Sequence, residues 1–315
     1  MSRQKLVDLL SVPSDLGANV EGSSRGPLVL KKALMSHEGL QKKINFFDKA
    51  EIKVPPRNRK NSSPKFEKEI LSVCKELRDQ VYNTLEENRF PLVLGGDHSL
   101  AVGSIFGASR YCIEQGLSLG IIWIDAHADM NTPTSSQTGN IHGMPLATVL
   151  GHGHNSLLEL AQGYTFVDPQ NVSLVGVRSI DRKEQVILDQ SQISYYRMDK
   201  IREKGALAIG KEIKKNLIDK VDCLHLSFDL DVMDPSLVPS VSTPEAEGMI
   251  WDEAQTFLES ISSSNKLLSM DIVEYNPDFE KENKGVEIAE RVLDSVFSKK
   301  NNFSFAEKKV QKPQK

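Results

Sequence analysis

The chain has few cysteines and no long apolar run. Its 315 residues include three cysteines, Cys74, Cys112 and Cys223, which are far apart and odd in number. This number excludes a disulfide framework and a thiolate metal site, and it predicts a reducing, cytoplasmic environment. No apolar stretch approaches the length of a bilayer span, and the first residues lead directly into a strand-like segment. We therefore expect neither a membrane span nor a secretory signal.

The chain also lacks an excess of charge of either sign. It has 39 lysines and arginines against 43 acidic residues, a net charge of −4, which predicts no affinity for nucleic acid or an anionic membrane. No repeat or shift in composition marks a linker, so residues 1–298 are expected to form a single α/β domain. The polar segment 53–64 and the lysine-rich tail 299–315 have little to bury, so we expect the tail to be flexible or to lie at a subunit interface.

Strand-like and helix-like segments alternate along the chain. Strands are predicted at 6–12, 44–47, 90–94, 117–124, 172–177, 193–196, 221–228 and 267–273. Helices are predicted at 27–35, 66–85 and 284–297. A further helix is predicted after the two glycines that follow the strand at 90–94, and it ends near residue 114. Such alternation predicts a parallel sheet with helices on both faces.

Five short motifs follow these strands or lie in the loop after one. They read Gly95-Gly96-Asp97-His98, Asp125-Ala126-His127-Ala128-Asp129, Gly139-Asn140-Ile141-His142-Gly143, Asp229-Leu230-Asp231 and Glu274-Tyr275-Asn276-Pro277. Alternate side chains of an extended segment share one face, so each spaced Asp/His set points in one direction. Ligands of an open parallel sheet bind beyond the carboxyl ends of its strands. We therefore expect four aspartates and two histidines to meet in a small volume.

This set of side chains predicts a pair of bound cations, because four carboxylates cannot all stay ionised together without positive charge between them. The predicted ligands are His98, Asp125, His127, Asp129, Asp229 and Asp231. Carboxylate and imidazole ligands without sulfur suit Mn²⁺ above all, with Co²⁺, Ni²⁺, Fe²⁺ or Mg²⁺ as alternatives. Two divalent ions balance the four aspartates, and a bridging hydroxide leaves one negative charge, which suits a cationic substrate. The sequence thus predicts a binuclear metal hydrolase.

Each motif alone has an ordinary structural explanation. An isolated Asp-x-Asp after a strand is usually a turn or a helix cap, and only the joint occurrence of the motifs favours a metal site. Two further histidines, His152 and His154, follow no strand, so we expect them in an exposed loop. His225 lies inside an apolar strand, where a core or subunit-contact role is expected.

These motifs resemble those of the ureohydrolase family of arginases and agmatinases, and the arginases most closely. The resemblance covers residues 6–298, and its most specific parts are residues 95–100, 123–131, 227–235 and 274–277. It implies a three-layer α/β/α sandwich with a mainly parallel sheet of about eight strands. It also implies two Mn²⁺ per subunit and the hydrolysis of L-arginine to L-ornithine and urea, by attack of a metal-bridging hydroxide on the guanidinium carbon. Related arginases are trimers or hexamers, so a homo-oligomer is expected.

The resemblance assigns roles to individual residues. One ion would be held by His98, Asp125, Asp129 and Asp229, and the other by His127, Asp125, Asp229 and Asp231. Asp129 would also orient the hydroxide. Glu274 would pair with the guanidinium group through charge-assisted hydrogen bonds, and His142 would carry protons to the leaving amine.

The resemblance further implies contacts to the amino-acid end of the substrate. Asn131, Thr138 and Asn140 would donate to the carboxylate, Asp181 and Glu184 would meet the ammonium group, and Thr243 would contact the guanidinium region. For Asp181 the alternative is a helix N-cap before Glu184. The chain departs from the usual pattern at three places. It has Thr138 where serine is common, Ser179 where aspartate is common, and Val-Ser-Thr-Pro at 241–244 where Gly-Thr-Pro is more usual.

Three other functions fit parts of the pattern. Another ureohydrolase would act on agmatine, guanidinobutyrate or formiminoglutamate instead of arginine. A binuclear metallophosphatase would also use carboxylates, but the chain has no phosphate-cradling glycine loop and no Asn-His-Glu motif, and Glu274 would repel a phosphate. A non-catalytic, arginase-like binding protein predicts lost ligands, yet all six are present.

Overall fold

A computed structural model describes residues 4–57, 65–161 and 163–298. These residues contain one sheet of eight strands in the order β2-β1-β3-β8-β7-β4-β5-β6. Every neighbouring pair is parallel. The strands are β1 Lys5–Val12, β2 Ile44–Glu51, β3 Phe90–Gly95, β4 Leu119–Ile124, β5 Val172–Val177, β6 Ser194–Arg197, β7 Cys223–Asp229 and β8 Leu267–Val273. The eight predicted strands are all present, and the sheet is fully parallel.

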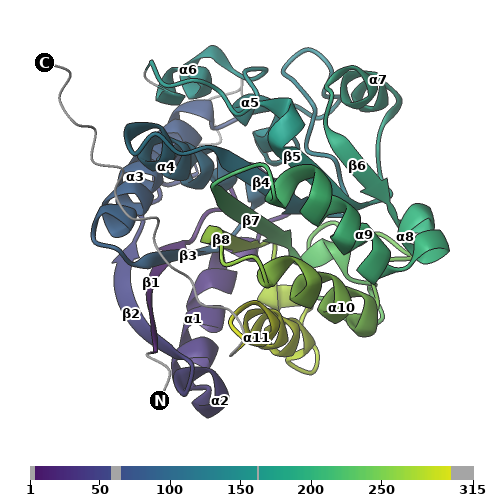
Figure 1. The fold of residues 1–315 in the computed structure, drawn as a ribbon. Helices are drawn as coiled ribbons and strands as arrows, with labels where there is room; N and C mark the ends of the chain where they lie inside the picture. Colours follow the sequence, from purple (N-terminus) through teal and green to yellow (C-terminus); the bar gives the residue numbers. More distant parts are fainter. Residues whose placement is uncertain (1–3, 58–64, 162, 299–315) are drawn as a thin grey trace, which may run out of the picture.

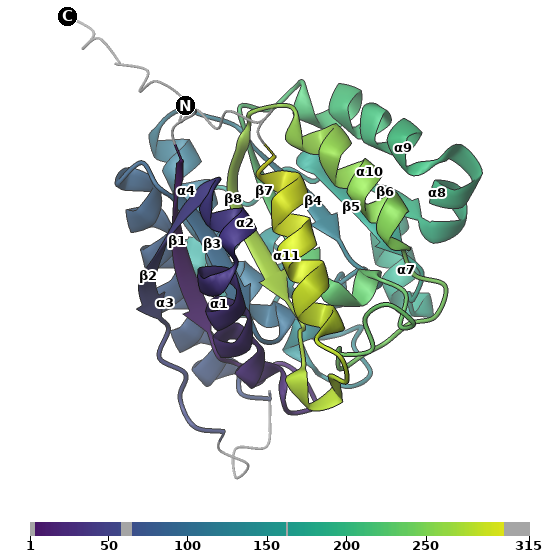
Figure 2. The same cartoon turned by 90° about the horizontal axis from the view of Figure 1, so that it is seen from below.

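Helices cover both faces of this sheet. Their bounds are α1 Gly26–Ser36, α2 Glu38–Gln41, α3 Glu67–Glu86, α4 Ala101–Glu114, α5 Pro145–Val149, α6 Asn155–Leu158, α7 Arg182–Gln190, α8 Met198–Lys204, α9 Ala206–Ile213, α10 Trp251–Ser262 and α11 Lys284–Val296. Helices α3 and α4 lie on one side, and α1, α10 and α11 lie on the other (Figures 1 and 2). The predicted three-layer α/β/α sandwich is confirmed.

The central strands are largely apolar because both of their faces are covered. Every residue of β4 is buried, and the side chains of residues 121–124 alternate between two cores. Ile122 and Ile124 pack in the core that includes Phe257 of α10. Ile121 and Trp123 pack in the core beneath α4. No helix within the described ranges is both long and apolar enough to cross a bilayer.

The edge of the sheet differs from the prediction. Strand β2 continues to Glu51, four residues beyond the predicted end, because its backbone pairs with β1 up to Ser11. Its side chains are mostly half-buried or exposed, so the apolar pattern that marks a central strand is absent there. The tail 299–315 and part of the segment 53–64 lie outside the described residues.

Four of the predicted site motifs follow β3, β8, β7 and β4, which are neighbours in the middle of the sheet, so their carboxyl ends meet. After β3 the chain turns through Gly96, where a Cβ atom would lie 1.9 Å from the backbone oxygen of Ser14. Only glycine allows this approach. The Asp97 carboxylate then accepts a hydrogen bond from the Ser99 amide at 2.9 Å and begins a helical turn, which brings His98 to the edge of the sheet.

Candidate metal centre

Contacts on both sides fix the imidazole of His98. The ring stacks on Trp123, with centroids 4.2 Å apart and an interplanar angle of 15°. Its Nε2 atom lies 2.8 Å from the hydroxyl of Ser227 in β7. Nδ1 is therefore the ring nitrogen that faces the ends of the neighbouring strands.

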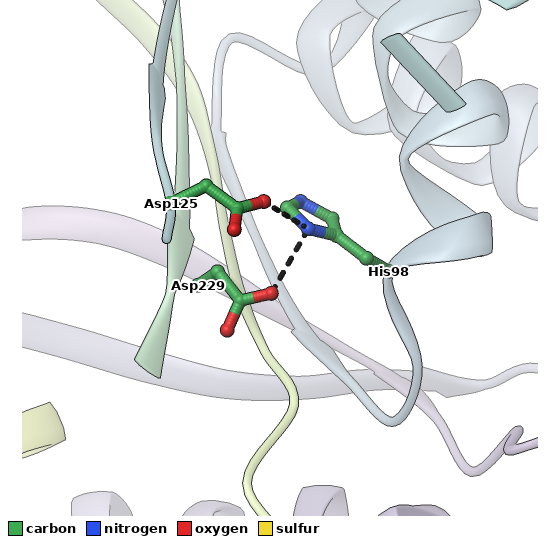
Figure 3. A group of neighbouring side chains, drawn as sticks. All are labelled: His98, Asp125 and Asp229. Atoms are coloured by element: carbon green, nitrogen blue, oxygen red, sulfur yellow. Dashed lines mark ion pairs between the residues drawn. The ribbon is translucent and has the colours of Figure 1, made fainter. Parts of the chain in front are cut away.

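Three carboxylates converge on that nitrogen. The Nδ1 atom of His98 lies 3.1 Å from both Asp125 and Asp229 (Figure 3). It also lies 3.2 Å from Asp129. One ring N–H cannot donate to three acceptors in good geometry. Nδ1 and the Oδ2 atom of Asp129 are both buried without a hydrogen-bond partner. A cation between these four side chains would satisfy all of them, so the residues fit a metal ion.

A second group lies beside the first and shares Asp125 with it. The Nδ1 atom of His127 lies 2.9 Å from Asp231 and 3.6 Å from Asp125. Asp125, His127 and Asp231 can offer ligand atoms to one ion, as can His98, Asp125 and Asp229. The structure thus brings all six predicted ligands together and arranges them around two adjoining positions.

The pKa values of the candidate ligands show an excess of negative charge in the site. Burial and the neighbouring Asp125 raise the pKa of Asp129 to about 6. Burial, Asp231 and Asp125 raise the pKa of Asp229 well above its usual range. Burial alone would lower the pKa of His98, but the carboxylates around it raise that pKa well above 6.5. The carboxylates repel one another and attract positive charge, as expected of a site for cations.

Two acidic residues of the site have an unusual backbone conformation. Asp129 has a φ of 51° and Glu274 has a φ of 64°, both in the left-handed region that non-glycine residues rarely adopt. The Glu274 amide donates to the oxygen of Gly96 at 2.8 Å, so the turns after β8 and β3 support each other. Strained residues of this kind concentrate at functional sites.

Glu274 is buried beside the metal ligands and has one free oxygen. Its Oε1 atom accepts a hydrogen bond from the His98 amide at 2.8 Å and lies 3.2 Å from Nδ1 of His142. Its Oε2 atom is buried without a hydrogen-bond partner. Burial disfavours the charged form of His142, but the Glu274 carboxylate outweighs it and raises the pKa of His142 to about 9. The pair presents a carboxylate and a protonated imidazole to the site.

A cavity opens over these side chains, with about 450 Å³ of atom-free space, part of it open to solvent. Its lining residues are His98, His127, Asp129, Asn131, His142, Gly143, Glu184, Asp229, Asp231, Thr243 and Glu274. Three of the predicted substrate contacts, Asn131, Glu184 and Thr243, are therefore at the cavity.

The other three predicted substrate contacts lie outside this lining. Thr138 is exposed, and the Oδ1 atom of Asn140 accepts a hydrogen bond from Lys65 at 2.9 Å. The Asp181 carboxylate accepts from the amides of Lys183 and Glu184, at 2.9 and 3.1 Å, as the N-cap of α7. The helix-cap alternative for Asp181 is thus the arrangement that the structure contains.

The remaining histidines are outside the site. His225 is fully buried between Ser269 and Asp271, at 2.8 and 3.1 Å, which agrees with the predicted core role. His152 is exposed, as predicted. The expected exposure is wrong for His154, whose side chain is 13% exposed and contacts Glu67 at 3.3 Å.

One arginine important to the site was missed in the sequence. Arg178 follows β5, and its guanidinium group donates to backbone oxygens of two loops. It bonds the oxygens of Asp231 and Val232 at 2.8 and 3.1 Å, and those of Glu245 and Ala246 at 2.8 and 2.9 Å. It thereby holds the loop after β7, which carries the predicted ligand Asp231. A lone arginine after a strand gives no sequence signal for this role.

The fold and the site define a class of protein: an α/β/α hydrolase in which two histidines and four aspartates that could hold metal ions lie at the carboxyl edge of a parallel sheet. The chain belongs to the arginase family, whose model matches residues 5–298. It is 36% identical over 307 residues to an arginase of Staphylococcus aureus (strain COL), covering 94% of this chain and 98% of the relative.

Solved structures agree with this assignment. The arginase of Bacillus caldovelox superposes with a TM-score of 0.88 at 33% identity, over 94% of this chain and 99% of that one. The arginase of Bacillus subtilis gives a TM-score of 0.84 at 34% identity, with coverage of 94% and 99%. The predicted family and fold are confirmed, and the protein is a hydrolase of the arginase type.

Proposed function

We propose that the protein is an arginase that converts L-arginine and water to L-ornithine and urea. The observation that carries the proposal is the group of three carboxylate oxygens within 3.2 Å of Nδ1 of His98, beside the unpaired Oε2 atom of Glu274. Positions for cations and an acceptor for a cationic substrate are thus next to each other. The similarity of the chain to curated arginases over nearly its full length supports the same reaction.

We infer that the cations are two Mn²⁺ ions. His98, Asp125, Asp129 and Asp229 would hold one, and His127, Asp125, Asp229 and Asp231 would hold the other. A sulfur-free set of carboxylates and imidazoles supports this choice over a softer metal, with Co²⁺, Ni²⁺ or Fe²⁺ as substitutes. When bound, such a pair lowers the pKa of a water molecule that it shares and so supplies a nucleophile near neutral pH.

The chain's own residues would orient the substrate and move protons. The free oxygen of Glu274 would accept hydrogen bonds from the guanidinium group and hold its planar carbon toward the ligands. Asp129, strained and buried, would accept a hydrogen bond from the attacking water. His142, whose pKa the Glu274 carboxylate raises in the metal-free protein, would donate a proton to the departing amine.

The outer part of the cavity would select arginine over amines that lack its α-carboxylate. Asn131, Glu184 and Thr243 already line the cavity. Thr138, Asn140 and Asp181 would contribute from the surrounding loops. A site that hydrogen-bonds a charged group discriminates strongly against an analogue without it, because the site's polar groups are then left unpaired.

We further propose that the protein acts in the cytoplasm as a trimer or hexamer. Its three cysteines are free and buried, which suits a reducing compartment. The oligomeric state is an expectation from the family. Light scattering on purified protein measures it directly, and a monomeric mass would contradict it.

The test of the reaction is urea release by purified protein loaded with Mn²⁺, with L-arginine and agmatine in parallel. We expect urea mainly from arginine. Faster cleavage of agmatine would contradict the assignment of the outer cavity and favour agmatinase activity. Absence of urea from both substrates, with metal bound, would favour a non-catalytic binding protein.

A further inference from the structure

The second ring nitrogen of His127 faces an acidic residue that lies outside the six ligands. While Nδ1 points toward Asp231 and Asp125, Nε2 lies 3.7 Å from the Oε1 atom of Glu245. The hydroxyl of Ser179 donates to the same oxygen at 2.9 Å. The His127 side chain is 27% exposed and that of Glu245 is 40% exposed, so the contact lies at the rim of the site.

Two adjacent residues hold Glu245 in this position. Arg178 donates to its backbone oxygen at 2.8 Å, and Ser179 donates to its carboxylate. Ser179 also forms a parallel backbone bridge with His127. The loop after β5 is therefore tied both to the ligand and to the glutamate, which fixes the glutamate against the imidazole despite its partial exposure.

We propose that Glu245 is a positioning residue for the metal ligand His127. Its carboxylate, 3.7 Å from Nε2, electrostatically favours a proton on that nitrogen, so that the ring presents Nδ1, without a proton, toward Asp231 and Asp125. A histidine that binds a metal commonly gives its other N–H to a carboxylate, which fixes the tautomer and ring orientation and strengthens the ligand. This inference rests on the proposed metal centre.

The predicted effect is confined to one of the two ions. Loss of such a partner typically weakens metal binding by about 10- to 100-fold. A contact of 3.7 Å at the rim favours the lower end, so we expect about tenfold weaker binding of the ion held by His127. The ion held by His98 should keep its affinity, because the ring of His98 is fixed by Trp123 and Ser227 instead.

The experiment is a calorimetric titration of Mn²⁺ into metal-free protein. The wild type is compared with Glu245→Ala and with Glu245→Gln, which keeps the shape and an oxygen acceptor but loses the charge. Glu247→Gln is the matched control, since Glu247 lies on the same loop and its side chain is 84% exposed near Arg202. Thermal unfolding of the metal-free variants checks that each one folds, and the isosteric Gln variant keeps the test decisive if the Ala variant does not.

The proposal predicts a lower affinity for one of the two ions in Glu245→Ala, a smaller decrease in Glu245→Gln and no decrease in Glu247→Gln. Ser179→Ala alone should weaken the binding of the same ion. Added to Glu245→Ala it should cause no further loss of affinity, because Ser179 acts through Glu245. Wild-type affinity for both ions in the Glu245 variants would overturn the proposal and leave the proposed function intact. Failure of the wild type to bind two ions would overturn the proposed function as well.

Discussion

Substitution of Glu274 by glutamine tests how the site recognises its substrate. The change removes one negative charge and keeps the size and the Oε1 acceptor for the His98 amide. The lost interaction is a buried ion pair with the guanidinium group, since Oε2 is buried and has no partner in the protein. Removing one partner of a buried pair costs about 3–5 kcal/mol. We therefore expect kcat/KM for arginine to fall by about two to three and a half orders of magnitude.

The assay is urea release at arginine concentrations well below KM, with bound metal measured in parallel. Metal content should be unchanged, because Glu274 is not a proposed ligand. Asp278→Asn is the control: it removes a charge four residues away, in an exposed ion pair with Arg25 that contributes little. A fall of less than tenfold in Glu274→Gln, with metal retained, would refute the proposed pairing with the guanidinium group.

Three further changes test other parts of the site. Asp229→Asn should lose bound metal and nearly all urea release, as measured by metal analysis after dialysis; full metal occupancy would contradict its role. His142→Asn should keep its metal but lower kcat by about 10²–10⁴-fold, the usual range for a general acid, and an unchanged kcat would exclude that role. Glu184→Gln tests the pH dependence of stability. Burial raises the pKa of Glu184 from 4.5 to about 7. The folded state therefore binds this proton more tightly than the unfolded state, and wild-type stability is lost as the pH rises from 4.5 through 7. Relative to the wild type, metal-free Glu184→Gln should gain about 3 kcal/mol in unfolding free energy over that interval, measured by denaturant titration, and parallel pH profiles would contradict the assignment.

The strands of the sheet could be predicted because their signal is local. Strands β5 and β8 have the predicted bounds, since each is a short, largely apolar segment. The order of the strands could not be predicted, because β8 pairs with β3 and β7 across large separations in sequence. The extension of β2 was missed for a related reason, since backbone pairing with β1 sets its length and its side chains carry no apolar pattern.

The gathering of the six candidate ligands could also be predicted, because alternate spacing after a strand is visible in the sequence. The groups that orient them could not. Ser227 bonds a histidine 129 positions away, and Arg178 holds the oxygen of Asp231, 53 positions away. Asp181 shows the limit of local reasoning, because its helix-cap contacts follow from the sequence, whereas its hydrogen bond from Asn131 of the cavity lining joins residues 50 positions apart.

The central claim is that the six gathered side chains hold a pair of divalent cations. The most direct test is an anomalous difference map from crystals grown with Mn²⁺ and measured at the manganese absorption edge. We predict two peaks about 3.5–4 Å apart, one beside Nδ1 of His98 and the other beside Nδ1 of His127, with Asp125 between them. A single peak, or none among these side chains at full loading, would contradict the account.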